Sequence, residues 1–198
     1  MCTAYNLGKR KGNFPKRLKK DARQQLDSIA ESKLMRPTLQ GPVILPDGQL
    51  AEMRWGFSRK FSNAVVSARE DKLDSPMRQV AMRESRCLIP LAAYFEWSGP
   101  TGQKRTHRFT SPEDDWLWIA GIWEHHQEYG RCYSMITTEP TGVVRGIHSR
   151  MPAILSLDQT DAFLDGTMRN FDPAPGLLAV ADSANPLRKG RPEQTELF

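Results

Sequence analysis

The chain has 198 residues, of which 39% are hydrophobic and 26% are charged, and its 28 Lys and Arg against 23 Asp and Glu give a formal net charge of +5. This composition is typical of a folded domain, and it is too apolar for a disordered chain. The three cysteines argue against a disulfide-stapled secreted module, and no apolar run reaches the roughly 18 residues that a membrane span needs. We therefore expect a single cytoplasmic domain over residues 1–198, without a signal peptide.

The predicted elements begin with a hydrophobic pattern of helical period. An amphipathic helix is predicted over residues 15–34, where Pro15 suits the first helical position. Residues 43–55 follow as a hairpin, since Asp47-Gly48 is a strong turn signal between two apolar segments. Both assignments depend on local signals only.

Later elements are predominantly extended. We expect a short helix over 77–86, and then one dense apolar strand over 87–97. A capping box at Ser156–Gln159 predicts a helix that Gly166 ends. The remaining strands are predicted at 107–109, 116–123, 133–138 and 177–180. The spacing of the strands favours an α+β fold that is mostly antiparallel, with residues 170–198 as a peripheral C-terminal extension.

The basic residues are concentrated at the start of the chain. Residues 1–20 hold seven Lys and Arg and no acidic residue. Such a block is typical of a phosphate-binding surface or of a solvated segment, and the composition does not choose between them.

Cys2 has a chemical reason for its position. Removal of Met1, expected before a small residue, would leave an amine of pKa about 7.7–8.0 and a thiol of pKa about 8.5 on one residue. Such a 1,2-aminothiol captures aldehydes, because the amine forms an imine and the sulfur closes a thiazolidine ring. Alternatively the thiol attacks a carbonyl, as in N-terminal-nucleophile hydrolases. A cysteine at this position can also be a chance occurrence.

Two further residues are candidates for proton transfer. Glu96 lies within the apolar run, where burial would raise its pKa and suit it to acid–base catalysis; a structural salt bridge is the alternative. His148 lies among small residues beside two arginines, where it can be a proton shuttle near phosphate or a structural histidine. We expect no zinc site, because the four potential ligands do not have the spacing of one: Cys87, Cys132, His125 and His126. We expect no metal and no cofactor, and we interpret both of these cysteines as small apolar strand residues.

Several short motifs occur in order between residue 2 and about residue 155. They are Met1-Cys2, Arg54-Trp55-Gly56, Arg86-Cys87-Leu88-Ile89-Pro90, Phe95-Glu96-Trp97, Ala120-Gly121-Ile122-Trp123-Glu124, Thr137-Thr138 and His148-Ser149-Arg150-Met151-Pro152. Together they resemble the SRAP family (SOS-response-associated peptidase, or abasic-site-processing proteins). The resemblance implies a compact, β-rich, barrel-like α+β domain that binds single-stranded DNA in a basic cleft. It also implies that the N-terminal cysteine forms a thiazolidine crosslink with the ring-opened aldehyde of an abasic site, which shields the lesion.

The resemblance also implies roles for individual residues. Cys2 would be the nucleophile, Glu96 the general acid–base in imine formation, and His148 the group that assists sugar-ring opening and crosslink reversal. The positions that it implies at the DNA are Arg69 and Arg150 on phosphates, Trp55 and Trp97 on flanking bases, and Thr137 and Ser67 in the pocket. It further implies a DNA-associated monomer away from membranes, a peptidase activity that removes Met1, and a lyase activity.

The sequence departs from the family pattern at three places, one of which is the stretch around Met35 to Pro42, where the usual Asn-x-Ala-Pro is missing. Thr3-Ala4 follows Cys2 where many members have Gly-Arg, so a phosphate-binding arginine is missing, and Lys9, Arg10 or Lys11 can substitute for it. Ser67 stands where many members have Asn, and its shorter side chain offers a single hydroxyl. Two other functions stay open: an N-terminal-nucleophile peptidase or amidohydrolase, and a non-covalent single-strand-binding module.

Overall fold

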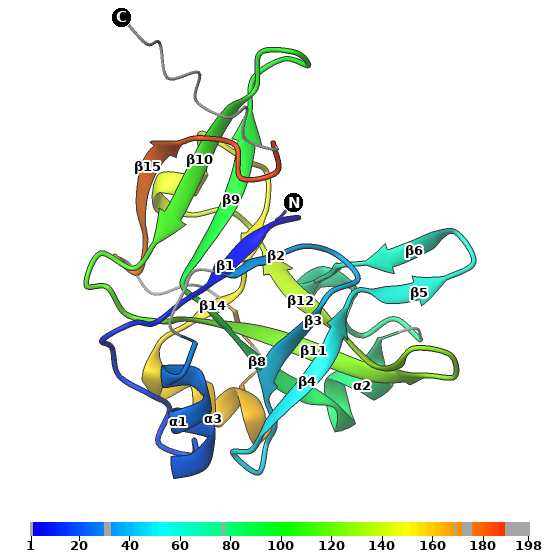
Figure 1. Ribbon diagram of the computed structural model, residues 1–198. Helices are drawn as coiled ribbons and strands as arrows, with labels where there is room; N and C mark the ends of the chain where they lie inside the picture. Colours follow the sequence, from blue (N-terminus) through cyan, green and yellow to red (C-terminus); the bar gives the residue numbers. More distant parts are fainter. Residues whose placement is uncertain (1, 30–32, 77, 169, 172–175, 189–198) are drawn as a thin grey trace, which may run out of the picture.

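A computed structural model describes residues 2–29, 33–76, 78–168, 170–171 and 176–188 (Figure 1). The described helices are α1 (Lys20–Asp27), α2 (Gln79–Glu84) and α3 (Leu157–Leu164), with single 3₁₀ turns at Glu70–Lys72 and Gly142–Val144. Strands make up most of the remaining regular structure. No described helix combines the length and the apolar character that crossing a bilayer requires.

Five strands close into a barrel. They are β3 (Gln40–Ile44), β4 (Leu50–Trp55), β8 (Arg86–Leu91), β11 (Leu117–His126) and β12 (Gly130–Thr138), paired in the order β12–β4–β3–β8–β11 and back to β12. Only the β12–β4 pair is parallel. Gly121 lets β11 pack closely on β8 inside this barrel, because a Cβ there would lie 2.7 Å from Ile89 Cδ1 and would force that side chain to move. Short strands extend the barrel sheet: β7 (Ser67–Arg69), β13 (Met151–Pro152) and β14 (Ile154–Leu155).

A second sheet of five strands lies against the barrel. Its order is β15–β10–β9–β1–β2, with β1 (Tyr5–Leu7), β2 (Lys33–Met35), β9 (Ala93–Ser98), β10 (Arg105–Thr110) and β15 (Ala179–Ser183). Beyond it, β5 (Phe57–Arg59) and β6 (Ser62–Val65) form a separate hairpin. In Figure 1, α1 and α3 lie together at the end of the molecule away from the N-terminus and the β9–β10 hairpin.

The structure confirms the mostly antiparallel, barrel-like α+β fold with a few flanking helices. The hairpin turn at Asp47-Gly48 is confirmed, with Gly48 at φ +78°, and so are the capping box at Ser156 and the left-handed Gly166 at φ +82°. Cys87 and Cys132 are buried strand residues, as expected.

Two predictions of secondary structure were wrong. The helix expected over 15–34 is restricted to Lys20–Asp27, because a turn closed by the Leu18 amide on the Pro15 carbonyl precedes it and the helix ends at Ser28; residues 30–32 lie outside the described part. The single strand expected over 87–97 is two strands, β8 and β9, which meet at Ala92 and belong to different sheets. In the expected C-terminal extension, β15 is the edge strand of the second sheet, whereas residues 172–175 and 189–198 are not described.

Candidate active site at the start of the chain

Cys2 is held at the entrance to β1, a strand inside the second sheet. β1 pairs with β2 on one side and with β9 on the other, so the start of the described chain is fixed on both sides. The Phe95 amide donates a hydrogen bond to the Ala4 carbonyl at 3.1 Å, and the Cys2 thiol donates to the same carbonyl at 3.3 Å. Burial, and then the nearby charge of Glu96, raise the pKa of the Cys2 thiol far above its ordinary value. The resting sulfur is therefore a protonated thiol, and it needs a base to react.

Glu96 is the buried carboxyl of this region. It lies on β9 between β1 and β10, and only 1% of its surface is exposed. Burial raises the pKa of this carboxyl to about 7, because the low-dielectric surroundings disfavour the charged form. At neutral pH the protonated and ionised forms are therefore both populated. A carboxyl in that state can donate a proton in one step of a reaction and accept one in another.

His148 faces Glu96, with 3.8 Å between its Nε2 atom and Glu96 Oε2. Its other ring nitrogen, Nδ1, lies 3.1 Å from the Arg150 amide nitrogen and 3.0 Å from the Arg150 carbonyl oxygen. When Nδ1 accepts from the amide, the neutral ring carries its proton on Nε2, toward the carboxyl. Burial lowers the pKa of His148, so the neutral ring predominates at pH 7. Glu96 and His148 thus form a pair that can exchange a proton.

The end of β12 brings two predicted phosphate-binding arginines together. Thr137 is buried, and it lies opposite Pro152 on β13 and opposite Arg69 on β7. The Arg150 guanidinium donates to the Thr137 carbonyl and forms an ion pair with Glu139, with 2.6 Å between Nη1 and Oε1. The parallel pairing of β7 with β12, which has no local sequence signal, places Arg69 beside this cluster.

Arg69 and Ser67 lie at opposite ends of β7. Arg69 is exposed and bonded to Asp71, with 2.8 Å between Nη2 and Oδ2. This hydrogen bond lowers the pKa of Asp71. Ser67, the residue that stands where the family pattern has Asn, lies opposite Met135 on β12. The Arg69–Asp71 pair is exposed on both sides, which is the kind of ion pair that contributes little stability and exchanges readily, whereas the Arg150 side chain is only 11% exposed and is also held by the Thr137 carbonyl.

The two predicted base-stacking tryptophans lie in different environments. Trp55 has no exposed surface: its ring centroid lies 4.9 Å from that of Tyr5 and 6.5 Å from that of Tyr133, and its Nε1 donates to the Val66 carbonyl. The expectation that Trp55 stacks on a base is therefore wrong, because this side chain is part of the core. Trp97, next to Glu96, is half-buried and lines a groove together with Thr3.

Two cations of the basic block of residues 1–20 are engaged by acidic side chains away from Cys2. Arg17 forms ion pairs with Asp161 and Asp165 at α3, at the end of the molecule away from the N-terminus (Figure 1). Arg10, one of the substitutes considered for the missing arginine, donates to the Ala92 carbonyl and pairs with Asp114. The cations that line the groove beside Thr3 come from elsewhere in the chain: Lys104, Arg105 and Arg188. Among the described residues, no cluster of three or more His, Cys, Asp or Glu side chains could hold a metal ion.

Comparisons with known proteins give one consistent assignment. A family model described as "SOS response associated peptidase (SRAP)" matches residues 1–187. The abasic site processing protein YoaM of Bacillus subtilis (strain 168) is 28% identical over 157 residues, which cover 71% of this chain and 69% of YoaM. The abasic site processing protein YoqW of Bacillus phage SPbeta is 28% identical over 146 residues, which cover 66% of this chain and 64% of YoqW. The chain thus spans about two thirds of the length of these relatives.

Solved structures support the fold. A protein from Bacteroides thetaiotaomicron superposes with a TM-score of 0.74 at 17% identity, covering 93% of each chain. A protein from Bordetella bronchiseptica superposes with a TM-score of 0.71 at 22% identity, covering 93% of this chain and 100% of that one. At these identities the likeness establishes the architecture alone.

Proposed function

The chain belongs to the SOS response associated peptidase (SRAP) family, since the family model matches residues 1–187, and on that premise we propose that it processes abasic sites in DNA by covalent capture through Cys2. The names of the relatives YoaM and YoqW support abasic site processing. The observation that carries the proposal is the site itself: a fixed N-terminal cysteine beside a buried carboxyl of pKa about 7, which in turn faces a neutral histidine at 3.8 Å.

The reaction uses the Cys2 amine after Met1 has been removed. The amine adds to the aldehyde carbon of the ring-opened abasic sugar, and loss of water gives an imine. The Cys2 sulfur then adds to the imine carbon while the thiol proton passes to the nitrogen, which closes a thiazolidine ring. One amine, one thiol and one aldehyde are consumed, and one water is released.

Glu96 supplies the acid–base steps of this sequence. Its protonated form donates to the hydroxyl that leaves as water, and its carboxylate form accepts a proton from the Cys2 thiol, which burial keeps protonated at rest. His148, with its Nε2 toward Glu96, moves the proton that opens the sugar ring, and in the reverse direction it serves crosslink reversal and a lyase step. Imine formation precedes thiol addition in this scheme, because burial keeps the Cys2 thiol protonated, and a protonated thiol is a poor nucleophile until Glu96 accepts its proton.

The strand is held by residues around this pair. Arg69 exchanges its exposed carboxylate partner for a backbone phosphate, since such exposed pairs are weak, and Arg150 binds a phosphate from the more enclosed position in which the Thr137 carbonyl holds it. Trp97 stacks on a base next to the lesion, which suits a single strand because stacking is insensitive to sequence. Thr137 and Ser67 contact the sugar. We further propose that the protein acts as a monomer, in the cytoplasm and in association with DNA, and that the peptidase activity named for the family is the removal of Met1.

The test is the intact mass of the full chain, alone and after incubation with a single strand that carries one abasic site. The expected masses are the chain without Met1 and the protein–DNA adduct less one water, stable in SDS without borohydride. Cys2→Ala and Cys2→Ser should both abolish the adduct that is stable without borohydride, because each keeps the amine but lacks the thiol that closes the ring. Cys132→Ala, which changes a buried cysteine of the barrel, is the control and should crosslink. Absence of the adduct from the wild-type protein would refute the proposal.

The same samples distinguish the two other functions. An N-terminal-nucleophile peptidase or amidohydrolase would turn over peptides or small amides without DNA and would lose that turnover in Cys2→Ala. A non-covalent binding module would bind intact and abasic strands equally, and Cys2→Ala would bind as the wild type does.

A further inference from the structure

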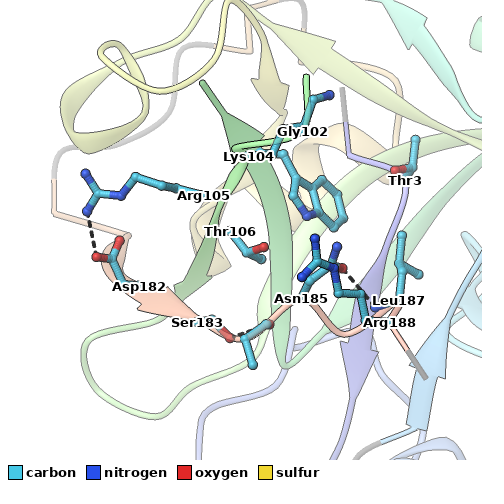
Figure 2. Close-up of a pocket in the computed structure, with 12 residues that line it drawn as sticks. Thr3, Gly102, Lys104, Arg105, Thr106, Asp182, Ser183, Asn185, Leu187 and Arg188 are labelled. Carbon is cyan, nitrogen blue, oxygen red and sulfur yellow. Dashed lines mark hydrogen bonds and ion pairs between the residues drawn. The ribbon is translucent and has the colours of Figure 1, made fainter. Parts of the chain in front are cut away.

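A groove of about 1280 Å³ lies beside the start of the chain, between the loop that joins β9 to β10 and the segment that follows β15 (Figure 2). Gly102 and Lys104 come from the first of these walls, and Asn185, Leu187 and Arg188 come from the second. Thr3, the residue after Cys2, lines the groove as well. The groove therefore reaches to within one residue of the proposed nucleophile.

The lining of the groove has the chemistry of a single-strand site. Arg105 is paired with Asp182, with 2.7 Å between Nη2 and Oδ2. Lys104 and Arg188 are exposed, and no hydrogen bond or ion pair joins either side chain to another residue drawn in Figure 2. Half-buried Trp97 adds an aromatic surface, and Leu187, 41% exposed, adds an apolar one. Cations interleaved with a stacking surface are what a nucleic-acid single strand requires, whereas small-molecule sites are mostly apolar and enclosed.

The second wall is a built part of the fold. β15 pairs with β10 over five residue pairs, from Thr110–Ala179 to Thr106–Ser183. After β15, Asn185 closes a turn: its side-chain oxygen accepts from the Leu187 amide at 3.0 Å, and its carbonyl accepts from the Arg188 amide at 3.2 Å. The position of Arg188 along the groove is thus set by local hydrogen bonds.

The floor of the groove lies on the other face of β9 from Glu96, whereas Arg105 and Asp182 at its edge belong by register to the face of Glu96. Trp97, Thr106 and Ser183 are direct cross-strand neighbours, and all three line the groove. Because successive residues of a strand point to opposite faces, Glu96 lies on the reverse side, where His148 and Arg150 are. Cys2 is buried, and Thr3, the next residue, lines the groove.

From this arrangement we propose that the groove holds the part of the DNA strand on one side of the lesion, with Lys104 and Arg188 on its phosphates, while Arg69 and Arg150 hold the part on the other side. The inference rests on the proposed function, since it takes abasic single-stranded DNA as the ligand. It assigns a role to residues 183–188 and replaces the missing arginine after Cys2 with cations from two distant segments.

The experiment measures binding without chemistry. The probe is a single strand that carries a tetrahydrofuran abasic analogue, which has no aldehyde, and the readout is fluorescence anisotropy over a range of salt concentrations. The double variant Lys104→Ala/Arg188→Ala should bind roughly three- to tenfold more weakly. Its plot of log affinity against log salt should be shallower by about 1.4, since each phosphate contact on a single strand contributes about 0.7. Lys16→Ala/Lys19→Ala removes the same charge near α1 and is the matched control.

Truncated probes then test the placement. Removal of one flank, the 3′ or the 5′, should erase the difference in affinity between Lys104→Ala/Arg188→Ala and wild type. Removal of the other flank should erase the difference in affinity between Arg69→Ala/Arg150→Ala and wild type. If the groove variant binds as tightly as wild type, or if both variants depend on the same flank, the inference is overturned. That failure is separate from failure of the proposed function, because a wild-type protein that forms the crosslink leaves the function intact.

Discussion

Glu96→Gln is expected to stabilise the protein above neutral pH while it impairs the reaction. Burial raises the pKa of Glu96 from 4.5 to about 7, so the folded chain binds this proton more tightly than the unfolded chain does. The free energy of unfolding must therefore fall as the pH rises through this window, because ionising the carboxyl is harder in the folded state. Glutamine is neutral at every pH, and it removes this cost.

The size of the effect follows from the two pKa values. Between pH 5 and pH 8, the wild type should lose about 2 to 3 kcal/mol of stability that Glu96→Gln keeps. Comparing the two proteins at both pH values cancels any pH-independent change in hydrogen bonding. In a domain of this size the gap should appear as a relative shift of roughly 5–10 °C in the thermal midpoint.

The assay is thermal and urea unfolding of both proteins at pH 5 and pH 8. Glu139→Gln, a surface carboxyl beside Arg150, is the matched control and should show no comparable gain. A stability difference between wild type and Glu96→Gln that is the same at both pH values would refute the reasoning. It would mean that the pKa of Glu96 is not raised by folding, because only a raised pKa makes this carboxyl lower the stability as the pH rises.

Three further outcomes are expected. The pH–rate profile of crosslinking should bend near pH 7 in the wild type and lose that bend in Glu96→Gln; an unchanged profile would exclude Glu96 as the titrating group. Urea unfolding should show that Trp55→Ala costs about 3–5 kcal/mol, whereas Trp97→Ala should mainly weaken strand binding; equal stability losses would contradict their different burial. Asp71→Asn should tighten strand binding by up to about fivefold in anisotropy, because it releases Arg69 for phosphate, and weaker binding would count against that exchange.

Local signals in the sequence predicted the elements that local hydrogen bonds define. The Asp47-Gly48 turn and the capping box at Ser156 are complete within a few residues, so nothing distant could override them. The passage from β8 to β9 was missed because both strands are apolar and only their pairing partners differ. Hydrophobic periodicity detects that a strand is buried, but it does not identify the sheet to which the strand belongs.

The different environments of Trp55 and Trp97 also depend on contacts between distant segments and not on local sequence. Each stands in a short motif that the family resemblance associates with DNA, and the sequence around Trp55 carries no sign of burial. Tyr5 from β1 and Tyr133 from β12 close over the Trp55 ring, and both are far from it in sequence. The Trp97 ring is not enclosed in this way, because its neighbours across the sheet are the small side chains of Thr106 and Ser183, which leave room for a groove.

Charge shows most clearly what a sequence alone leaves open. The seven cations in the first 20 residues suggested a phosphate-binding surface, yet Arg17 is paired with α3 acids and Arg10 with Asp114. Of the cations that flank the proposed nucleophile, only Arg69 and Arg150 were predicted from sequence, and the β7–β12 and β10–β15 pairings bring Arg69 and the segment of Arg188 to the site. Because the attraction to a phosphate is screened within about 10 Å at ordinary salt, the position of each cation relative to Cys2 matters more than the net charge of the chain. An abasic strand would therefore be guided by these few residues, and removing charge near α1 should leave its binding almost unchanged.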